Sequence, residues 1–258
     1  MQHLDLTLSQ PAENLALDEA LLDAAESGDG PDEIVRLWES PKPAVVVGRS
    51  SRLSLEVNLD ECQRQGVPVL RRSSGGATIV AGPGCLMYAV VLSYTRRPHL
   101  RPLDQAHGFV LGQLAEAIGK RLPGVRRAGT SDLVLVDDAA AADDQQGNCV
   151  GNVTARKFSG NSLRCKRTHM LYHGTLLYDF PLRSIGAYLL SPPRQPDYRD
   201  RRTHAKFVSN VPLDRAALAS AVLDAFDAHE ATEAWPEQRV TELVTTCYGR
   251  DQWTTQFE

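Results

Sequence analysis

The sequence predicts an α+β fold in which mixed, largely antiparallel sheets are flanked by helices. Short apolar runs of strand length alternate along the 258 residues with segments whose apolar residues recur at helical spacing. The chain shows no internal repeat and no strong linker, so we expect a single catalytic domain over residues 1–258. At this length, and with 42% hydrophobic residues, the chain is able to bury a substantial core.

The amino-terminal part of the chain predicts one long helix, one short helix and several strands. NLALDEALLDAAESGD, which begins at Asn14, has the apolar spacing of a helix, and LEVNLDECQRQG predicts a short helix that ends at Gly66. A Pro-containing turn around Lys42 joins two predicted strands, EIVRLWES and PAVVVGRS. Further strands follow at residues 67–70 and in IVAGPGCLMYAVVLSY, which is broken at residues 82–84.

The rest of the chain continues this alternation. LDQAHGFVLGQLAEAIGKRL, from Leu103, has a clear apolar stripe and predicts a helix closed by Pro123 and Gly124. DLVLV predicts a strand, and the acidic segment DDAAAADDQQGN predicts an exposed, mobile loop because it offers little to bury. VTARKFSGNSLR and MLYHGTLLYDF predict adjacent strands joined by the CKRTH turn. DRAALASAVLDAFDAH and TELVTTCYGRDQWTTQF predict two further helices.

Composition argues against several classes of protein. The 28 Lys and Arg residues against 32 Asp and Glu residues give a formal net charge of -4, which argues against a protein that coats nucleic acid. No run reaches the roughly 18 to 20 apolar residues of a membrane span, and MQHLDLTLSQ lacks the pattern of a signal peptide. We therefore expect a cytoplasmic protein with neither a membrane nor a nucleic-acid partner. The five cysteines are scattered without CxxC spacing, which favours free, mostly buried thiols.

A basic, glycine-containing turn, RRSSGGAT at residues 71–78, lies between two apolar runs. A Gly-Gly pair allows backbone N–H groups to approach an anion closely, and arginines supply forked donors for a carboxylate or phosphate. The spacing matches neither GxxxxGK[ST] nor GxGxxG, so it predicts neither a P-loop nor a dinucleotide fold. The alternative is that Gly75 and Gly76 form only a tight turn while Arg71 and Arg72 face solvent.

Two later segments also carry candidate functional residues. In TARKFSGNS, Lys157 precedes a small polar turn of Ser159, Gly160 and Asn161, and the alternative is an ordinary solvated strand lysine. In YHGTLLY, His173 is a candidate base, although a histidine that is simply hydrogen-bonded within a strand is the commoner case.

Taken in order, these segments resemble the catalytic domain of the lipoate-protein ligase A and octanoyltransferase family, whose fold is shared with biotin-protein ligases and is class II synthetase-like. The resemblance covers nearly the whole chain. The blocks that carry it are NLALDEALL, RLWESPKPAVVVGRSSRLSLEVN, RRSSGGAT, SDLVLV, RKFSGNS, YHGTLL and the closing DQW.

The resemblance implies ATP- and Mg²⁺-dependent attachment of lipoate or octanoate, through an acyl-adenylate, to a lysine of a lipoyl-domain protein. Such partners are the E2 subunits of 2-oxoacid dehydrogenases and the glycine-cleavage H protein. The family's catalytic lysine falls on Lys157, where an ammonium offsets charge that develops on acyl and leaving oxygens. Asp132 is expected to contact the nucleotide or Mg²⁺. Further binding positions fall on Arg71, Arg72, Ser74, Gly75, Gly76, Ala77, Thr78, Ser159, Gly160, Asn161, His173, Gly174 and Thr175. Apolar side chains of the Ile79 to Val91 strands and of the His173 to Leu177 block are expected to wall an acyl pocket.

The chain departs from the ligase pattern at several positions. Ala77 stands where the ligases usually have a third glycine, and Ala81–Gly82 and Gly84–Cys85 stand where they have His-Asp and Gly-Asn. The accessory domain that follows the catalytic domain in many ligases is expected to be absent, because the sequence stops at Glu258. Adenylation is then expected to involve a separate small partner protein.

Other activities remain open. An octanoyltransferase of the same family works without ATP through a cysteine thioester, but the two stretches where the family places that cysteine contain none. Cys149 and Cys165, each eight positions from Lys157, are the remaining candidate nucleophiles, and incidental roles are the alternative. A non-catalytic binder of lipoyl proteins is a further alternative, whereas the Gly-Arg-Gly-Arg loop of biotin-protein ligases is missing.

A basic segment, QPDYRDRRTHAKFVSN, stands out in an acidic chain. It contains Arg199, Arg201, Arg202, His204 and Lys206, and Arg194 lies just before it. Lipoyl domains and acyl carrier proteins are typically acidic, so this surface loop is a candidate for docking the partner or closing over the nucleotide. A solvated charged loop is the alternative.

Overall fold

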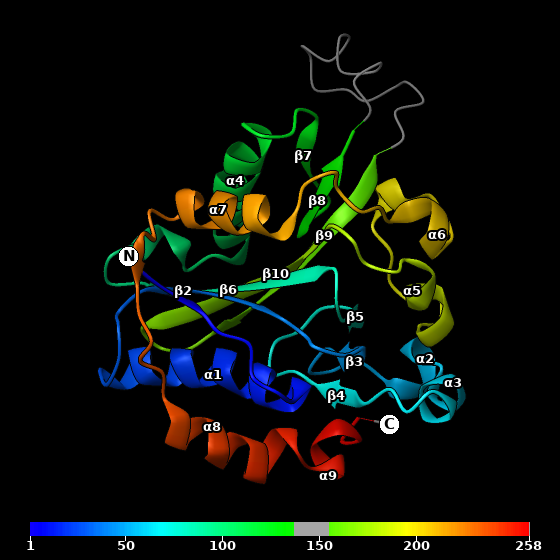
Figure 1. Cartoon of the computed structure of the whole chain (residues 1–258), viewed down its shortest axis with the longest axis horizontal. Coiled ribbons are helices and arrows are strands. Elements are labelled where there is room, and N and C mark those ends of the chain that lie inside the picture. Colours follow the sequence, from blue (N-terminus) through cyan, green and yellow to red (C-terminus); the bar gives the residue numbers. More distant parts are fainter. Residues whose placement is uncertain (137–154, 258) are drawn as a thin grey trace.

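A computed structural model describes residues 1–136 and 155–257. In this part of the chain the strands form an eight-stranded sheet, in the order β11-β1-β2-β6-β10-β9-β8-β7, and a three-stranded sheet, in the order β4-β3-β5. Helices flank both sheets (Figure 1), which confirms the predicted α+β class with mixed, largely antiparallel strands.

The large sheet contains both kinds of pairing. β1 runs parallel to β2 and β11, whereas β2–β6, β6–β10, β10–β9, β9–β8 and β8–β7 are antiparallel. Its strands are β1 (Gln2–Asp5), β2 (Ile34–Glu39), β6 (Cys85–Ser93), β7 (Val125–Ala128), β8 (Asp132–Leu135), β9 (Arg156–Cys165), β10 (His169–Leu177) and β11 (Glu230–Ala231). The predicted hairpin across CKRTH is thereby confirmed as β9 and β10.

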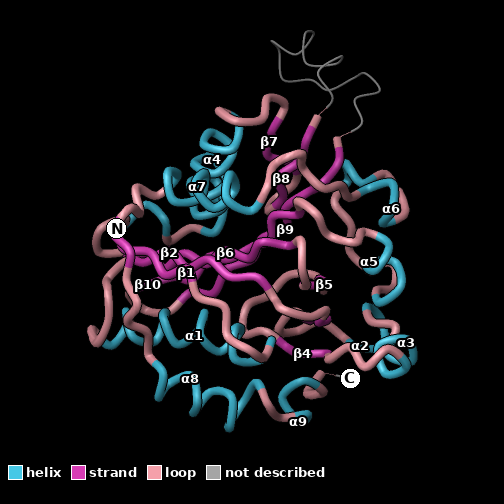
Figure 2. Tube along the Cα trace, in the orientation of Figure 1, coloured by secondary structure: helices cyan, strands magenta, loops and turns pink. Residues whose placement is uncertain are grey.

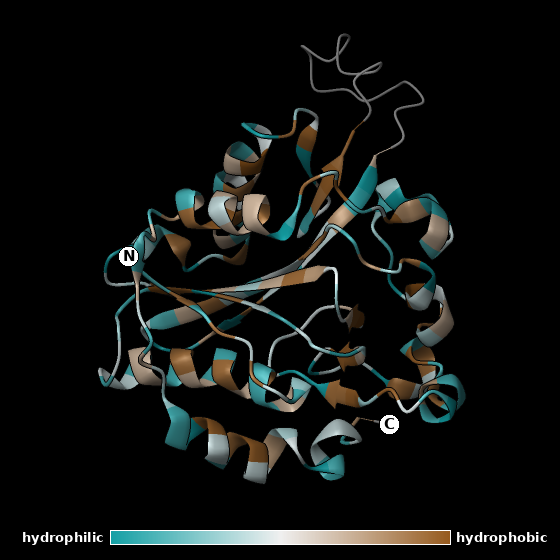
Figure 3. Ribbon diagram, viewed as in Figure 1, coloured by the Kyte–Doolittle hydropathy of each residue, from teal (hydrophilic) through white to brown (hydrophobic). Residues whose placement is uncertain are grey.

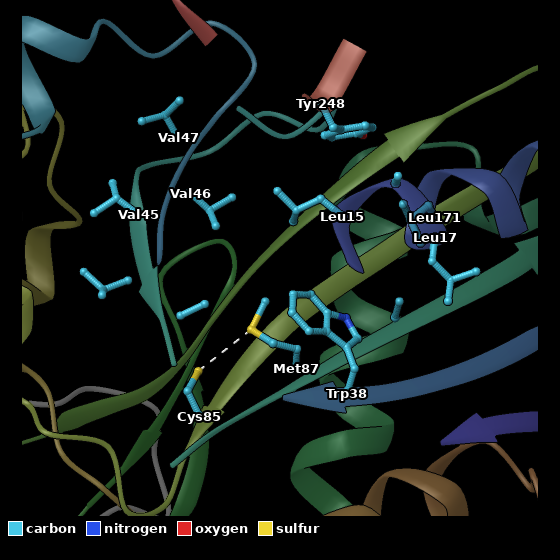
Figure 4. Close-up of a cluster of buried hydrophobic side chains, with 14 of the residues drawn as sticks. Leu15, Leu17, Trp38, Val45, Val46, Val47, Cys85, Met87, Leu171 and Tyr248 are labelled. Carbon is cyan, nitrogen blue, oxygen red and sulfur yellow. Dashed lines mark hydrogen bonds between the residues drawn. The ribbon is translucent and has the colours of Figure 1, made fainter. Parts of the chain in front are cut away.

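Both faces of the large sheet are covered, as Figures 1 and 2 show. One face carries α1 (Pro11–Ser27), with α8 (Glu237–Leu243) and α9 (Asp251–Thr254) outside it, and the other carries α4 (Leu103–Gly119) and α7 (Arg215–Ala225). Along β6, alternate residues therefore enter two separate cores. Met87 packs with Trp38 and Leu171 on the α1 side (Figure 4), whereas Tyr88 packs on the α4 side.

The small sheet lies beside the α1 face. It consists of β3 (Ala44–Val47), β4 (Val69–Arg71) and β5 (Ile79–Ala81), and β3 and β4 are strongly hydrophobic (Figure 3). The turn around Lys42 therefore carries the chain from β2 in one sheet to β3 in the other. The RRSSGGAT turn connects β4 to β5, so it is a loop of this small sheet.

Short helices surround the open end of the small sheet. They are α2 (Leu53–Glu56), α3 (Leu59–Arg64), α5 (Arg183–Tyr188) and α6 (His204–Phe207). The single helix predicted before Gly66 is thus two helices, and Asn58 between them caps α3 by accepting from the Glu61 amide at 3.3 Å. The helix predicted from Leu103 ends at Gly119, before the predicted stop at Pro123.

Several predictions concern segments outside this description. The segment DDAAAADDQQGN and the candidate nucleophile Cys149 lie outside the described residues. Within residues 1–136 and 155–257, no helix combines the length and the apolar character that crossing a membrane requires.

Candidate functional site

Two cavities meet on the α1 side of the large sheet, beside the small sheet. The smaller, of about 120 Å³, has mainly apolar walls, and the larger, of about 360 Å³, is more polar. Apolar walls of the first are Ile79, Val80, Phe158, Leu177, Ile185, Leu189 and Phe207, whereas the second is lined by Arg72, Asp132, Asn161, His173 and Arg194 among others. Residues that line both are Ala77, Thr78, Ile79, Lys157, Gly160 and Thr175. Of the side chains predicted to wall an acyl pocket, the apolar cavity is lined by Ile79, Val80 and Leu177. Met87 of the same prediction lines the polar cavity.

Lys157 lies where the two cavities meet. A β-bulge at Leu133/Val134 interrupts the β8–β9 pairing next to it, and such bulges re-aim side chains. The Lys157 Nζ atom lies 2.7 Å from Asp132 Oδ1, and Asp132 Oδ2 accepts a 2.6 Å hydrogen bond from Tyr198. A Cβ atom on Gly160 would lie 2.8 Å from Nζ, so glycine at this position leaves room for the lysine.

His173 lies in a buried chain of polar groups that begins on helix α1. Asp18 contacts Arg36 at 2.6 Å through Oδ1, and its Oδ2 lies 3.5 Å from His173 Nδ1. His173 Nε2 is 2.6 Å from Ser74 Oγ. The order Ser-His-Asp is that of a nucleophilic triad, but Ser74 is 1% exposed and lines neither cavity. These polar contacts therefore fix the glycine turn, through Ser74, against His173 of β10.

The two arginines of RRSSGGAT use their donors inside the protein. Arg71 is fully buried, lines neither cavity, and donates to the carbonyls of Gly48, Arg49, Ser51 and Thr254. Arg72 lines the polar cavity but donates to Ser74 Oγ and to the carbonyls of Val46, Gly75 and Ala77. Burial lowers the pKa of Arg72 to about 10. In this structure the Arg72 guanidinium holds the glycine turn in shape, and the Arg71 guanidinium holds the segment at residues 48–51 and the end of α9. These donors are directed at carbonyls within the protein.

The rest of this turn shapes the rim of the cavities. Gly76 has φ 84°, a left-handed conformation that favours glycine, and it lines the polar cavity, whereas Gly75 lines neither cavity. The Thr78 amide and hydroxyl both donate to Glu56, at 2.9 and 2.7 Å. Glu56 lines the apolar cavity. The sequence did not predict it as a site residue, although it belongs to the LEVN segment of the family resemblance.

Strands β9 and β10 place a further group of predicted residues side by side. Asn161 donates to the Ser131 carbonyl at 2.8 Å and accepts from the Tyr88 hydroxyl at 2.5 Å. Its amide fills the space next to Gly174, where a Cβ atom would lie 1.8 Å from Asn161 Oδ1. The Thr175 hydroxyl accepts from the Gly160 amide, at 3.2 Å, on the side that faces the cavities. Ser159 lines the apolar cavity.

The basic segment is less exposed than the sequence suggests. Arg199 is 5% exposed and donates to the Arg202 carbonyl. Arg202 in turn donates to the carbonyls of Ala155, Tyr198 and Arg199. The exposed basic residues here are Arg194, Arg201 and Lys206, and Asp197 and Asp200 of the same segment are exposed as well, while Arg199 and Arg202 hold the backbone.

The cysteines of the described residues lie away from the junction of the cavities. Cys62 and Cys85 are buried, and burial raises the pKa of the Cys85 thiol. Cys247 is half-buried, with its pKa raised to about 11 by burial. Cys165 is exposed and pairs with Met170 at the opposite end of β9 from Lys157. All four thiols are free, as predicted, but only two of them are buried.

Comparison with known proteins gives matches of both family types. An Aeropyrum pernix protein named lipoate-protein ligase A is 30% identical over 174 residues, which cover 67% of this chain and 56% of the relative. Octanoyltransferase LipM of Brevibacillus brevis is 23% identical over 269 residues, which cover 94% of each chain. The chain spans about half the length of the first lipoate-protein ligase relatives.

Solved structures share the fold. One, described as a bi-partite lipoate protein ligase and its E2 lipoyl domain from Thermoplasma acidophilum, has a TM-score of 0.79 at 19% identity and covers 100% of this chain and 96% of that one. A lipoate-protein ligase A bound with ATP has a TM-score of 0.78 at 18% identity, with coverage of 100% and 99%. A family model described as the lipoyl protein ligase A/B catalytic domain matches residues 10–228. The chain therefore belongs to the lipoyl protein ligase A/B catalytic domain family.

Proposed function

We propose that this chain is a lipoate-protein ligase, which activates free lipoate or octanoate with ATP and attaches the acyl group to a lysine of a lipoyl-domain protein. One observation carries the proposal. The Lys157 ammonium lies between an apolar cavity suited to a hydrocarbon chain and a polar cavity suited to a charged group, and no described cysteine lines either.

The proposed reaction has two steps. In the first, a carboxylate oxygen of the acid attacks the α-phosphorus of ATP, and pyrophosphate leaves with the electron pair of the broken P–O bond. In the second, the neutral amine of the acceptor lysine attacks the acyl carbon, AMP leaves, and one amine proton passes to solvent. In the first step negative charge moves from the attacking carboxylate to the oxygen of the leaving pyrophosphate. In the second step it grows on the acyl oxygen and then on the leaving AMP phosphate. The Lys157 ammonium, already oriented by Asp132, is placed to stabilise that charge.

The residues of the polar cavity fit a magnesium nucleotide. No cluster of three His, Cys, Asp or Glu side chains exists among the described residues, but Mg²⁺ is commonly held by one or two carboxylates together with phosphate oxygens and waters. Asp132 supplies such a carboxylate. Each of its oxygens accepts one contact, from Lys157 and from Tyr198, and a carboxylate oxygen has a second lone pair, so Asp132 could hold Mg²⁺ and keep both contacts. When bound, the ion neutralises phosphate charge.

The alternative is an octanoyltransferase, and its support is the LipM match over 94% of both chains. Transfer through a thioester requires a thiolate near the acyl carbon. Cys165, eight positions from Lys157 on the same strand, lies roughly 26 Å away by the rise of an extended chain. Cys149 lies outside the described residues. The described thiols therefore favour the ligase.

Acyl transfer to a purified lipoyl domain tests the proposal. One reaction contains lipoate or octanoate with ATP and Mg²⁺, and the other contains octanoyl acyl carrier protein without ATP. A Lys157→Ala variant accompanies each. Product only in the first reaction is expected. Product only in the second would overturn the ligase in favour of the transferase and would make Cys149 and Cys165 the next residues to replace.

Two further experiments address the partners. Preformed lipoyl-adenylate distinguishes loss of activation from loss of transfer, since transfer from it without activity from ATP would point to a separate accessory protein for adenylation. Failure with every donor would support the non-catalytic binder. E2 lipoyl domains and the glycine-cleavage H protein should be compared as acceptors.

A further inference from the structure

Tyr198 contacts the centre of the proposed site from a segment distant in sequence. Its hydroxyl donates to Asp132 Oδ2 at 2.6 Å, while Asp132 Oδ1 holds the Lys157 ammonium. Both oxygens of the Asp132 carboxylate are thus bound, one by Tyr198 and one by Lys157.

The position of Tyr198 is itself fixed. Its ring packs against Phe207, with ring centroids 5.3 Å apart, and a Cβ atom on Gly129 would lie 3.3 Å from its edge. The Arg202 guanidinium donates to the Tyr198 carbonyl at 2.8 Å and to the Ala155 carbonyl at 2.9 Å. Arg202 therefore ties the turn that carries Tyr198 to the start of β9, the strand of Lys157.

This arrangement matters when a substrate enters. An acyl or phosphate oxygen at the junction of the cavities attracts the Lys157 ammonium. The contact between Lys157 Nζ and Asp132 Oδ1 then weakens. Because the Asp132 side chain is 9% exposed, an unanchored carboxylate would rotate to recover hydrogen bonds. The Tyr198 hydroxyl holds the carboxylate in place through Oδ2 while the lysine shifts its contact.

We propose that Tyr198 is a positioning residue for acyl activation or transfer, which acts through Asp132 to keep the Lys157 ammonium directed at the reacting oxygens. The inference rests on the proposed function for the reaction itself but not for the interaction between the three residues.

Tyr198→Phe removes only the hydroxyl. Tyr178→Phe is the matched control, since the Tyr178 hydroxyl also donates to a carboxylate oxygen, of Glu39 at 2.7 Å, and Tyr178 lines neither cavity. With the acyl donor that the wild type uses, we expect kcat to fall about tenfold in Tyr198→Phe, with the KM for the lipoyl domain unchanged. Tyr178→Phe should retain wild-type kcat, and the two variants should lose similar amounts of thermal stability.

A second readout does not depend on activity. In ¹H–¹⁵N spectra of the lysine ammonium groups, the Lys157 signal, assigned by its loss in Lys157→Ala, should move in Tyr198→Phe and stay in place in Tyr178→Phe. An unmoved signal would overturn the inference, as would a kcat equal to that of the wild type or an equal fall in both variants. A wild type that transfers no acyl group would instead refute the proposed function, and the spectrum would still decide the interaction.

Discussion

Gly174 provides a sharp test of the packing beneath the site. Replacement by alanine places a Cβ atom 1.8 Å from Asn161 Oδ1 and 2.9 Å from the Tyr88 ring, on the face of β10 opposite His173. The Asn161 side chain has to leave its position, and the Tyr88 hydroxyl and Ser131 carbonyl lose their hydrogen-bond partner. Overpacking and the unsatisfied polar groups together should lower the free energy of unfolding by about 3–5 kcal/mol.

Chemical denaturation of a double-mutant cycle measures this directly. Asn161→Ala alone removes the amide and should cost about 1–3 kcal/mol. In that background, Gly174→Ala should cost only about 1 kcal/mol, because the contact with Tyr88 alone remains.

Gly112→Ala is the control, since this helical glycine has no atom within 4 Å of the added Cβ; the change should be neutral or stabilise by up to about 1 kcal/mol. An equal cost of Gly174→Ala with and without Asn161 would refute the steric argument.

Three further predictions concern the core, pH and the nucleophile. Asp18→Asn removes the charge that pairs with the fully buried Arg36 and should lower the free energy of unfolding by about 3 kcal/mol in urea titrations; a cost below about 1 kcal/mol would contradict this. Burial opposes ionisation of Glu26, but hydrogen bonds from residues 168–169 outweigh it and lower the pKa of its carboxyl from 4.5 to about 2. The stability that Glu26 contributes is therefore present above about pH 4.5 and lost as the pH falls through about 2, so Glu26→Gln should destabilise at pH 7 and have little effect near pH 2. Cys165→Ser should leave the acyl-transfer rate unchanged, and a large loss of rate would revive the thioester mechanism.

Local patterns were enough to predict much of the framework. The uninterrupted apolar run of β6 is buried on both faces, and the β9–β10 hairpin follows from two strand patterns around one turn. Lys157 and Asp132, which the family resemblance selected, lie within 2.7 Å of each other because β8 and β9 are paired. Short strands such as β1 and the edge strand β7 were missed because four residues carry too little periodicity.

The role of buried charges was the main feature that the sequence concealed. Arg71 and Arg72 look like anion donors, yet whether their donors reach a ligand depends on distant carbonyls, including that of Thr254, 183 positions away. Asp18 and Tyr198 showed no signal because their partners, His173 and Asp132, meet them only in the folded chain. A sequence pattern reports residue type, whereas these roles are decided by tertiary contacts.

The role that we propose for Lys157 is compatible with either a ligase or a transferase reaction. In that role its ammonium would stabilise negative charge on an acyl oxygen whether the group bonded to the acyl carbon is a phosphate or a thiolate. The two reactions therefore differ chiefly in what lies beside the lysine, not in the lysine itself. The overall sequence identity to a ligase or to LipM is an average over all aligned residues, so it says little about the few residues beside the lysine. The residues around Lys157 are the stronger guide, and in the described part of the chain they place a carboxylate and hydroxyls there, without a thiol.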